Sequence, residues 1–119
     1  SYLGTVKREA EILLSLLAHT EHPDAAEAER AFKAGIAVAG TTALKFVPRE
    51  QLSLDNLNAA IDKLAELKPL LKPRILKACA ACLMYDGKAT IKAQELLRTV
   101  ASCLDSPMPP LAKETALST

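Results

Sequence analysis

The sequence predicts an all-α protein, a compact bundle of five to six helices, from its composition and from the spacing of its apolar residues. Of the 119 residues, 21 are Ala and 20 are Leu, whereas Val and Ile together supply 9 and Phe, Tyr and Trp only 4. Ala and Leu lose little freedom on entering a helix, and sheets favour the β-branched and aromatic residues that are scarce here. Half of the residues are apolar and the formal net charge is +1, which excludes the collagen-like and disordered classes. The length fits a single helical domain, which we place at residues 1–111.

Two helices are expected first, at about residues 3–19 and 24–39, because apolar residues recur there at helical spacing. Pro23 disfavours a helical conformation at the residue before it, so the break between the two helices falls there. Gly35 lies inside the second helix, where glycine costs about 1 kcal/mol relative to alanine, and we interpret it as a point where another helix packs closely. Gly40 is a plausible C-terminal cap.

Three further helices follow a connection over residues 41–50, in which Val47 is expected to be extended because it precedes a proline. Ser53 is a good N-cap for a helix that runs to about residue 68. The next helix begins at Pro73 and ends at the "YDG" of residues 85–87, and the last runs from Thr90 to about residue 104. Apolar residues from every helix are predicted to form the core: Leu13, Leu17, Phe32, Ile61, Leu64, Leu76, Leu83, Leu97 and Val100.

The "YDG" turn and the proline-rich ending are expected to have structural roles. The carboxylate of Asp86 can accept backbone N–H bonds in the turn, and Gly87 is expected to have a positive φ. Three prolines end the last helix and predict an extended segment: Pro107, Pro109 and Pro110. That segment is expected to lay Met108 and Leu111 along the bundle, and residues 112–119 are predicted to be a mobile C-terminal tail.

The three cysteines favour a reducing compartment over a disulfide scaffold, because their number is odd and the chain is long enough to build a core. Cys79 and Cys82 form a C-x-x-C motif, which in redox sites stands at the start of a helix that follows a strand. Here the motif falls in the middle of a predicted helix. A structural zinc site needs about four ligands, and only Cys103 and two distant histidines remain. We therefore predict reduced, metal-free core cysteines, with Cys79 largely buried.

His19 and His22 are the candidate metal ligands, because Glu21, Asp24 and Glu27 stand near them and two histidines with a carboxylate can bind a transition metal. We interpret the cluster instead as a flexible, polar turn between two helices, and predict no metal site. The His-Glu-x-x-His signature of zinc proteases occurs nowhere in the chain.

No pattern in the chain predicts catalysis by the chain itself. It contains no glycine-rich phosphate loop, no Ser-His-Asp order and no obvious pair of buried carboxylates, and the acidic residues and histidines fall on predicted surface faces. Residues 61–100 carry eight Lys or Arg against four Asp or Glu, a net charge of +4, whereas residues 1–60 carry −2. Because no aromatic residues are interleaved with these cations, we expect a solvated face and no nucleic-acid partner.

The chain contains no stretch approaching the roughly 20 apolar residues of a membrane span. Charged residues interrupt its start, so no signal peptide is predicted, and it begins with Ser rather than Met. We interpret it as a segment of a longer protein.

The region of residues 72–111 resembles the C-terminal end of HtpX-like bacterial membrane zinc metallopeptidases (metallopeptidase family 48). Those chains tend to end with a Lys-rich helix, a "DG" turn, a helix carrying "ELLR" and a Pro-Met-Pro-Pro segment. The matching residues here are Lys77, Asp86, Gly87, Glu95, Leu96, Leu97, Arg98, Leu104, Asp105, Pro107, Met108, Pro109 and Pro110. The residues upstream, over 8–36, resemble the preceding region of that family more loosely.

The resemblance implies that the parent protein is a zinc metalloendopeptidase with membrane helices and a zinc-binding His-Glu-x-x-His helix outside this chain. It implies that this chain is a soluble C-terminal domain on the cytoplasmic side of the inner membrane, with no cofactor of its own. Its implied partner is a protein: the protease domain, a substrate segment or another polypeptide. The oligomeric state stays open.

The helix–"DG"–helix unit also resembles TerB-like helical domains, which implies a TerB-like arrangement of the bundle. In that family an acidic residue commonly stands seven positions after the Asp, and here that position is Ala93. The divalent-metal role of that family is therefore not carried over. The alternative function is a standalone TerB-like stress-response or metal-responsive domain.

Overall fold

A computed structural model describes residues 4–41 and 43–109 of the chain. Within these residues there are five α-helices, one 3-10 turn and no strand, which confirms the all-α prediction. The helices are α1 (Lys7–Glu21), α2 (Ala25–Val38), α3 (Leu54–Ala65), α4 (Lys72–Leu83) and α5 (Ile91–Cys103), with η1 (Arg49–Gln51) ahead of α3. The predicted extended tail at Leu111, the residue Pro110 and the predicted mobile segment 112–119 lie outside the described residues.

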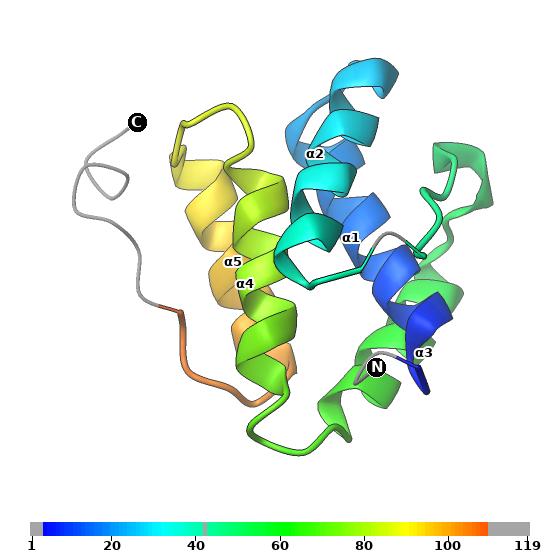
Figure 1. The fold of residues 1–119 in the computed structure, drawn as a ribbon, viewed down its shortest axis with the longest axis vertical. Coiled ribbons are helices and arrows are strands. Elements are labelled where there is room, and N and C mark those ends of the chain that lie inside the picture. Colours follow the sequence, from blue (N-terminus) through cyan, green and yellow to red (C-terminus); the bar gives the residue numbers. More distant parts are fainter. Residues whose placement is uncertain (1–3, 42, 110–119) are drawn as a thin grey trace.

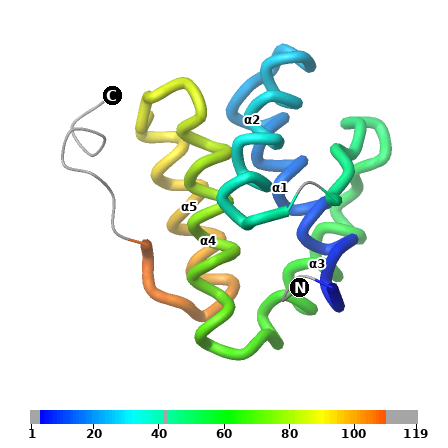
Figure 2. The backbone as a smooth tube through the Cα atoms, viewed as in Figure 1, coloured from blue at the N-terminus to red at the C-terminus, as the bar shows by residue number. Residues whose placement is uncertain are grey.

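The helices surround α1, which packs against α2, α3, α4 and α5. Figures 1 and 2 show α3 on one side of the α1–α2 pair and α4 and α5 on the other. Helix α2 packs closely on α4, and α4 packs on α5. No helix among the described residues combines the length and the apolar character that a bilayer crossing needs.

Local signals explain where most of the helices begin and end. Asp24, Ser53 and Thr90 cap α2, α3 and α5, because the side chain of each accepts a hydrogen bond from a backbone N–H in the first turn. Each such cap is worth about 1 kcal/mol. Helix α3 ends at Ala65, earlier than predicted, because a proline ring clashes with the carbonyl four residues before it and Pro69 follows.

Eight of the nine predicted core residues are buried, and the exception is Ile61, which is half-buried. Helix α3 packs chiefly on α1 at the edge of the bundle, so only Ala60 and Leu64 of α3 are fully enclosed. A helix with a single neighbour buries a narrow stripe, and Ile61 lies beside that stripe.

Gly35 is a point of close approach between α2 and α4, which confirms the prediction that another helix packs closely there. A Cβ atom at this position would lie 2.9 Å from the carbonyl oxygen of Ala78 and 3.2 Å from the Cβ atom of Cys82. Both of these residues are completely buried. Glycine is thus required here for packing, and its helix-propensity cost is offset by the contact between the two helices.

The carbonyl end of α1 receives two cations from distant parts of the chain. Arg49 donates to the carbonyl oxygens of His19 and Pro23, and Lys92 Nζ donates to the carbonyl oxygen of Thr20 at 2.7 Å. Positive charge is favourable at the C-terminus of a helix, where the last carbonyls have no partner within the helix. These contacts hold η1 and α5 against the end of α1.

Candidate functional site

His19 and His22 lie in the interior, so the interpretation of these residues as part of a flexible polar turn is wrong. They are only 8% and 7% exposed. His19 Nε2 lies 2.9 Å from the carbonyl oxygen of Val47, and His22 Nε2 lies 3.0 Å from that of Cys82. A carbonyl can only accept, so each Nε2 carries the proton and donates it. The hydrogen bond of His19 links α1 to the segment that contains Val47. The hydrogen bond of His22, the residue that follows α1, links it to Cys82 of α4.

The acidic residues near these histidines are engaged elsewhere. Glu21 accepts a hydrogen bond from the hydroxyl of Thr90 at 2.9 Å, Asp24 caps α2, and Glu27 forms an ion pair with Arg30. No cluster of three His, Cys, Asp or Glu side chains suited to a metal ion occurs in the part of the chain that the structure describes. The five residues that the sequence grouped as metal candidates are thus not brought together.

Cys79 and Cys82 are buried and Cys103 is exposed, and all three are free thiols. Burial raises the pKa of the Cys79 thiol well above its usual range, and it raises the pKa of Cys82 to about 12. Removing a thiol from water disfavours the thiolate, which is the form that reacts and binds metals. The prediction that Cys79 is buried is confirmed, and the raised pKa values favour the protonated thiols over the reactive thiolates.

The "YDG" turn has the predicted geometry. Gly87 has a φ of +82°, and the carboxylate of Asp86 accepts the backbone N–H of Lys88 at 3.1 Å. Leu104 is completely buried, and Met108 packs against the core from the proline-rich segment that begins at Pro107 and continues through Pro109. Asp86 and Gly87 therefore form a structural turn, and the described part of the proline-rich segment packs against the bundle.

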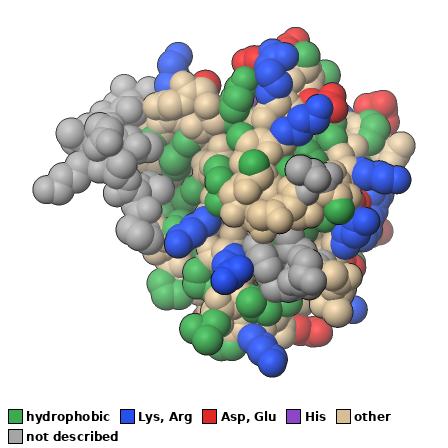
Figure 3. All heavy atoms as spheres, viewed as in Figure 1, with side chains coloured by type: hydrophobic (Ala, Val, Ile, Leu, Met, Phe, Trp, Pro, Cys, Tyr) green, Lys and Arg blue, Asp and Glu red, His purple; other side chains and the backbone are tan. Residues whose placement is uncertain are grey.

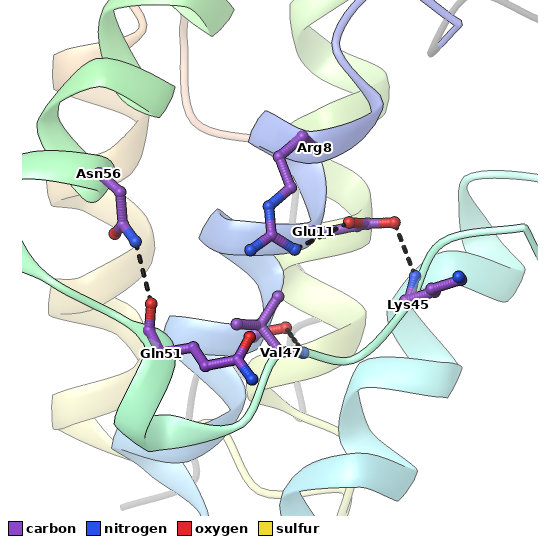
Figure 4. Close-up of polar contacts among 7 residues, drawn as sticks. Arg8, Glu11, Lys45, Val47, Gln51 and Asn56 are labelled. Carbon is purple, nitrogen blue, oxygen red and sulfur yellow. Dashed lines mark hydrogen bonds and ion pairs between the residues drawn. The ribbon is translucent and has the colours of Figure 1, made fainter.

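The segment of residues 44–47 lies on α1 and is held there by side chains of that helix. It forms neither helix nor strand, and its alternate residues Lys45 and Val47 bond to α1 as those of an extended chain do. Figure 4 shows Glu11 reaching towards it, where Glu11 accepts the backbone N–H of Lys45. Ser15 accepts the backbone N–H of Val47, and both bonds are 2.9 Å long. His19 adds the third bond, to the carbonyl oxygen of Val47. We call Glu11, Ser15 and His19 the α1 polar ladder.

The ladder matches the spacing of the two backbones. Four residues of an α-helix rise about 6 Å, and two residues of an extended chain span about 6.6 Å. Glu11 and Ser15, at i and i+4 of α1, therefore meet alternate residues of the segment, Lys45 and Val47. His19, at i+8, reaches the carbonyl oxygen of the same Val47. Glu11 is buried, with only 5% of the residue exposed. A guanidinium nitrogen of Arg8 lies 3.3 Å from its carboxylate and places a positive charge beside it.

A groove of about 640 Å³ runs between α2 and the segment 44–47. Its α2 side presents residues at helical spacing, and its other side presents consecutive residues of the segment: Glu29, Phe32, Lys33, Ile36, Leu44, Lys45 and Phe46. The floor is apolar. Phe32 and Phe46 have ring centroids 5.4 Å apart, and the ring of Phe46 also lies 4.7 Å from that of His19. We call this feature the α2 groove.

The rim of the α2 groove has more positive than negative charge. Lys33 Nζ lies 3.6 Å from a carboxylate oxygen of Glu29, so these two charges are paired. Lys45 has an exposed side chain for which the described residues provide no ion pair. Elsewhere on the face drawn in Figure 3, basic side chains are spread out rather than gathered in one patch. A volume of 300–1,000 Å³ with a mostly apolar lining and a few polar groups is typical of a binding pocket.

Comparisons with protein-family models, with curated proteins and with solved structures find no match to this chain. The candidate site is therefore defined by its own geometry.

The sequence reasoning missed this site because it placed the acidic residues on surface faces. Glu11 and Ser15 are buried on the apolar side of α1, where they bind backbone groups of the segment. The available signal was a Glu, a Ser and a His at i, i+4 and i+8, aligned on one helical face among leucines. Such a polar stripe inside an apolar face predicts buried polar partners.

Proposed function

We propose that this chain is a non-catalytic C-terminal accessory domain of a membrane-bound zinc metallopeptidase, and that its role is to bind a polypeptide. The link to a metallopeptidase rests on the resemblance of residues 72–111, including the Asp86–Gly87 turn and the proline-rich ending. The zinc site belongs to a part of the parent protein outside this chain.

The observation that carries the binding role is the α2 groove. It combines a floor of large apolar side chains with a cationic rim, and it lies next to a backbone segment that is fixed in an extended conformation. Grooves of this kind suit a peptide, because apolar side chains supply affinity and the rim supplies orientation. The bound polypeptide is a segment of the substrate or of the protease domain.

The full-length reading frame and a deletion variant test this proposal. We expect an upstream His-Glu-x-x-His helix and at least two membrane spans. A parent protein that lacks residues 1–119 of this chain should keep its zinc, because the ligands lie elsewhere, and should turn over its substrate more slowly. A reading frame without a zinc-binding helix would contradict the proposal and favour the standalone TerB-like domain.

A further inference from the structure

Among the described residues, one backbone edge of the segment 44–47 has no hydrogen-bond partner. Lys45 and Val47 direct their N–H groups to α1, where Glu11 and Ser15 accept them. Alternate residues of an extended chain direct their backbone groups to opposite sides. Leu44 and Phe46 therefore direct theirs away from α1, and within the described residues neither backbone forms a hydrogen bond.

This edge adjoins the α2 groove, because Leu44 and Phe46 also line it. An unpaired edge of an extended segment is a template for a further strand, and proteins that leave one open commonly use it to bind extended peptides. The α1 polar ladder fixes the template in place. A peptide would then lose less freedom on binding than it would against a flexible loop.

We propose, resting on the proposed function, that the α2 groove binds an extended peptide that pairs with the backbone of Leu44 and Phe46. One apolar side chain of the peptide enters the groove over Phe32 and Phe46. Acidic side chains two residues on either side of it lie on the same face of the peptide, because side chains alternate along a strand. There they approach the rim of the α2 groove, which carries Lys33 and Lys45.

The charge pattern selects this occupant over an uncharged or basic peptide. The rim has two lysines and one glutamate, and the glutamate is already paired with Lys33. A basic peptide would bring like charge towards Lys45, whereas an acidic one brings opposite charge to an ammonium that has no partner among the described residues. Such complementarity mainly selects the partner and orients it.

The test uses the whole chain and a synthetic heptapeptide, acetyl-Thr-Asp-Val-Leu-Val-Asp-Thr-amide, with amide NMR as the readout. On saturation, we expect the amide resonances of Leu44 and Phe46 to shift and their hydrogen exchange to slow. Two N-methylated peptides make the test specific for strand pairing. One peptide is N-methylated at both valines, and the other at the leucine and both aspartates. Alternate residues of a strand direct their N–H groups to opposite sides, so only one of the two peptides loses the N–H donors that face Leu44 and Phe46.

These two methylated peptides should differ in affinity by at least about tenfold, because removing two net hydrogen bonds costs roughly 1–3 kcal/mol. An equal loss with both would indicate a helical or purely side-chain mode and would overturn the inference. So would the absence of binding at millimolar peptide, or shifts confined to another face. Shifts of Leu44 and Phe46 that depend on protein concentration without peptide would assign the edge to a second copy of the chain and would also overturn it.

Charge reversal gives a second test that does not depend on the stability of the core. Lys45→Glu changes an exposed side chain, and it should weaken the acidic peptide and strengthen a peptide with lysines in place of the aspartates. Lys88→Glu, an exposed lysine in the turn before α5, is the matched control and should leave both affinities unchanged. Equal effects of the two variants would refute rim recognition.

The inference and the proposed function can fail separately. If the domain cross-links to the protease domain while the peptide does not contact the groove, the binding role stands and this mode of binding is wrong. If deletion of the domain leaves substrate turnover unchanged while the peptide still pairs with Leu44 and Phe46, the groove is real and the accessory role is wrong.

Discussion

Gly35 shows most directly how a single residue sets the packing of two helices. An added Cβ would lie 2.9 Å from the backbone oxygen of Ala78, which cannot rotate away as a side chain can. Gly35→Ala gains helix propensity, but the clash should outweigh it and lower the free energy of unfolding by at least about 1 kcal/mol. Denaturant unfolding measures the change. Ala37→Leu, the control, adds volume at an exposed position of α2 and should change the free energy of unfolding by no more than about 0.5 kcal/mol. A Gly35→Ala variant as stable as the parent would contradict the close approach of the two helices.

The buried thiols predict a loss of stability at alkaline pH. The pKa of Cys82 is raised from 9.0 to about 12 in the folded chain, and that of Cys79 is raised further. Above pH 9 the unfolded chain loses these protons while the folded chain keeps them, so the stabilisation is complete below pH 9 and falls as pH rises towards 12. Each thiol should contribute a slope of about 1.4 kcal/mol per pH unit in that window.

Urea unfolding between pH 8 and pH 10.5 tests this dependence against the Cys79→Ala/Cys82→Ala variant, with a phosphine reductant present. The variant is expected to be less stable overall but to show a shallower fall. In a native-state thiol titration at pH 8, Cys103 should react quickly and the other two only as fast as the chain unfolds. Three rapid thiols, or equal slopes for the two proteins, would show that the motif is not buried in solution.

At the scale of the elements, the α1 polar ladder fixes the extended segment. Ser15→Ala removes the acceptor of the Val47 N–H, and Val47 is only 1% exposed. Leaving a buried donor without a partner costs about 1–3 kcal/mol. We expect that loss in the free energy of unfolding, together with faster hydrogen exchange at Val47. Thr99→Ala, which removes an exposed hydroxyl on α5, is the control and should have little effect.

The turn between α4 and α5 depends on a conformation rather than on a contact. Gly87 has a φ of +82°, and apart from Gly87 itself and its two chain neighbours no described residue has an atom within 4 Å of the place a Cβ would occupy. Gly87→Val should therefore destabilise the chain by at least about 1 kcal/mol through backbone strain alone. Gly87→Asn should be milder, because asparagine tolerates this region. Equal thermal shifts for the two variants would point to crowding instead.

Asp86→Asn distinguishes a structural turn from an ion site. The amide oxygen of asparagine can still accept the Lys88 N–H, so a structural role predicts a small change in melting temperature. Melts with and without calcium, magnesium and zinc should be the same for the parent chain and the variant. If one of these ions raises the melting temperature of the parent chain but not that of the variant, Asp86 belongs to a metal site and the structural interpretation is wrong.

At the scale of the whole molecule, the proposal separates binding from catalysis. The purified chain should not cleave unfolded casein with or without added zinc, because attack requires a metal-polarised water and the His-Glu-x-x-His helix is expected elsewhere in the parent protein. A casein cleavage assay on protein from two independent purifications checks this. Cleavage that persists through purification and disappears with a point substitution in this chain would contradict it.

Local rules explain why the sequence predicted the helices, the caps and most of the core. Composition and apolar spacing predicted five to six helices, and Ser53 caps α3 as predicted. The positive φ of Gly87 also follows from a local turn. These features depend on neighbours within about four residues, which a sequence displays directly.

The sequence by itself determined the class of fold, the helix order and the burial of Cys79. Only the tertiary structure decided the roles of Glu11, Ser15 and His19, because their partners Lys45 and Val47 lie 28 to 34 residues away. From sequence alone, polar residues on a helix are predicted to lie on the surface unless the segment that forms hydrogen bonds with them is known. The α2 groove arises for the same reason: its two walls meet only when the extended segment has folded back over α1.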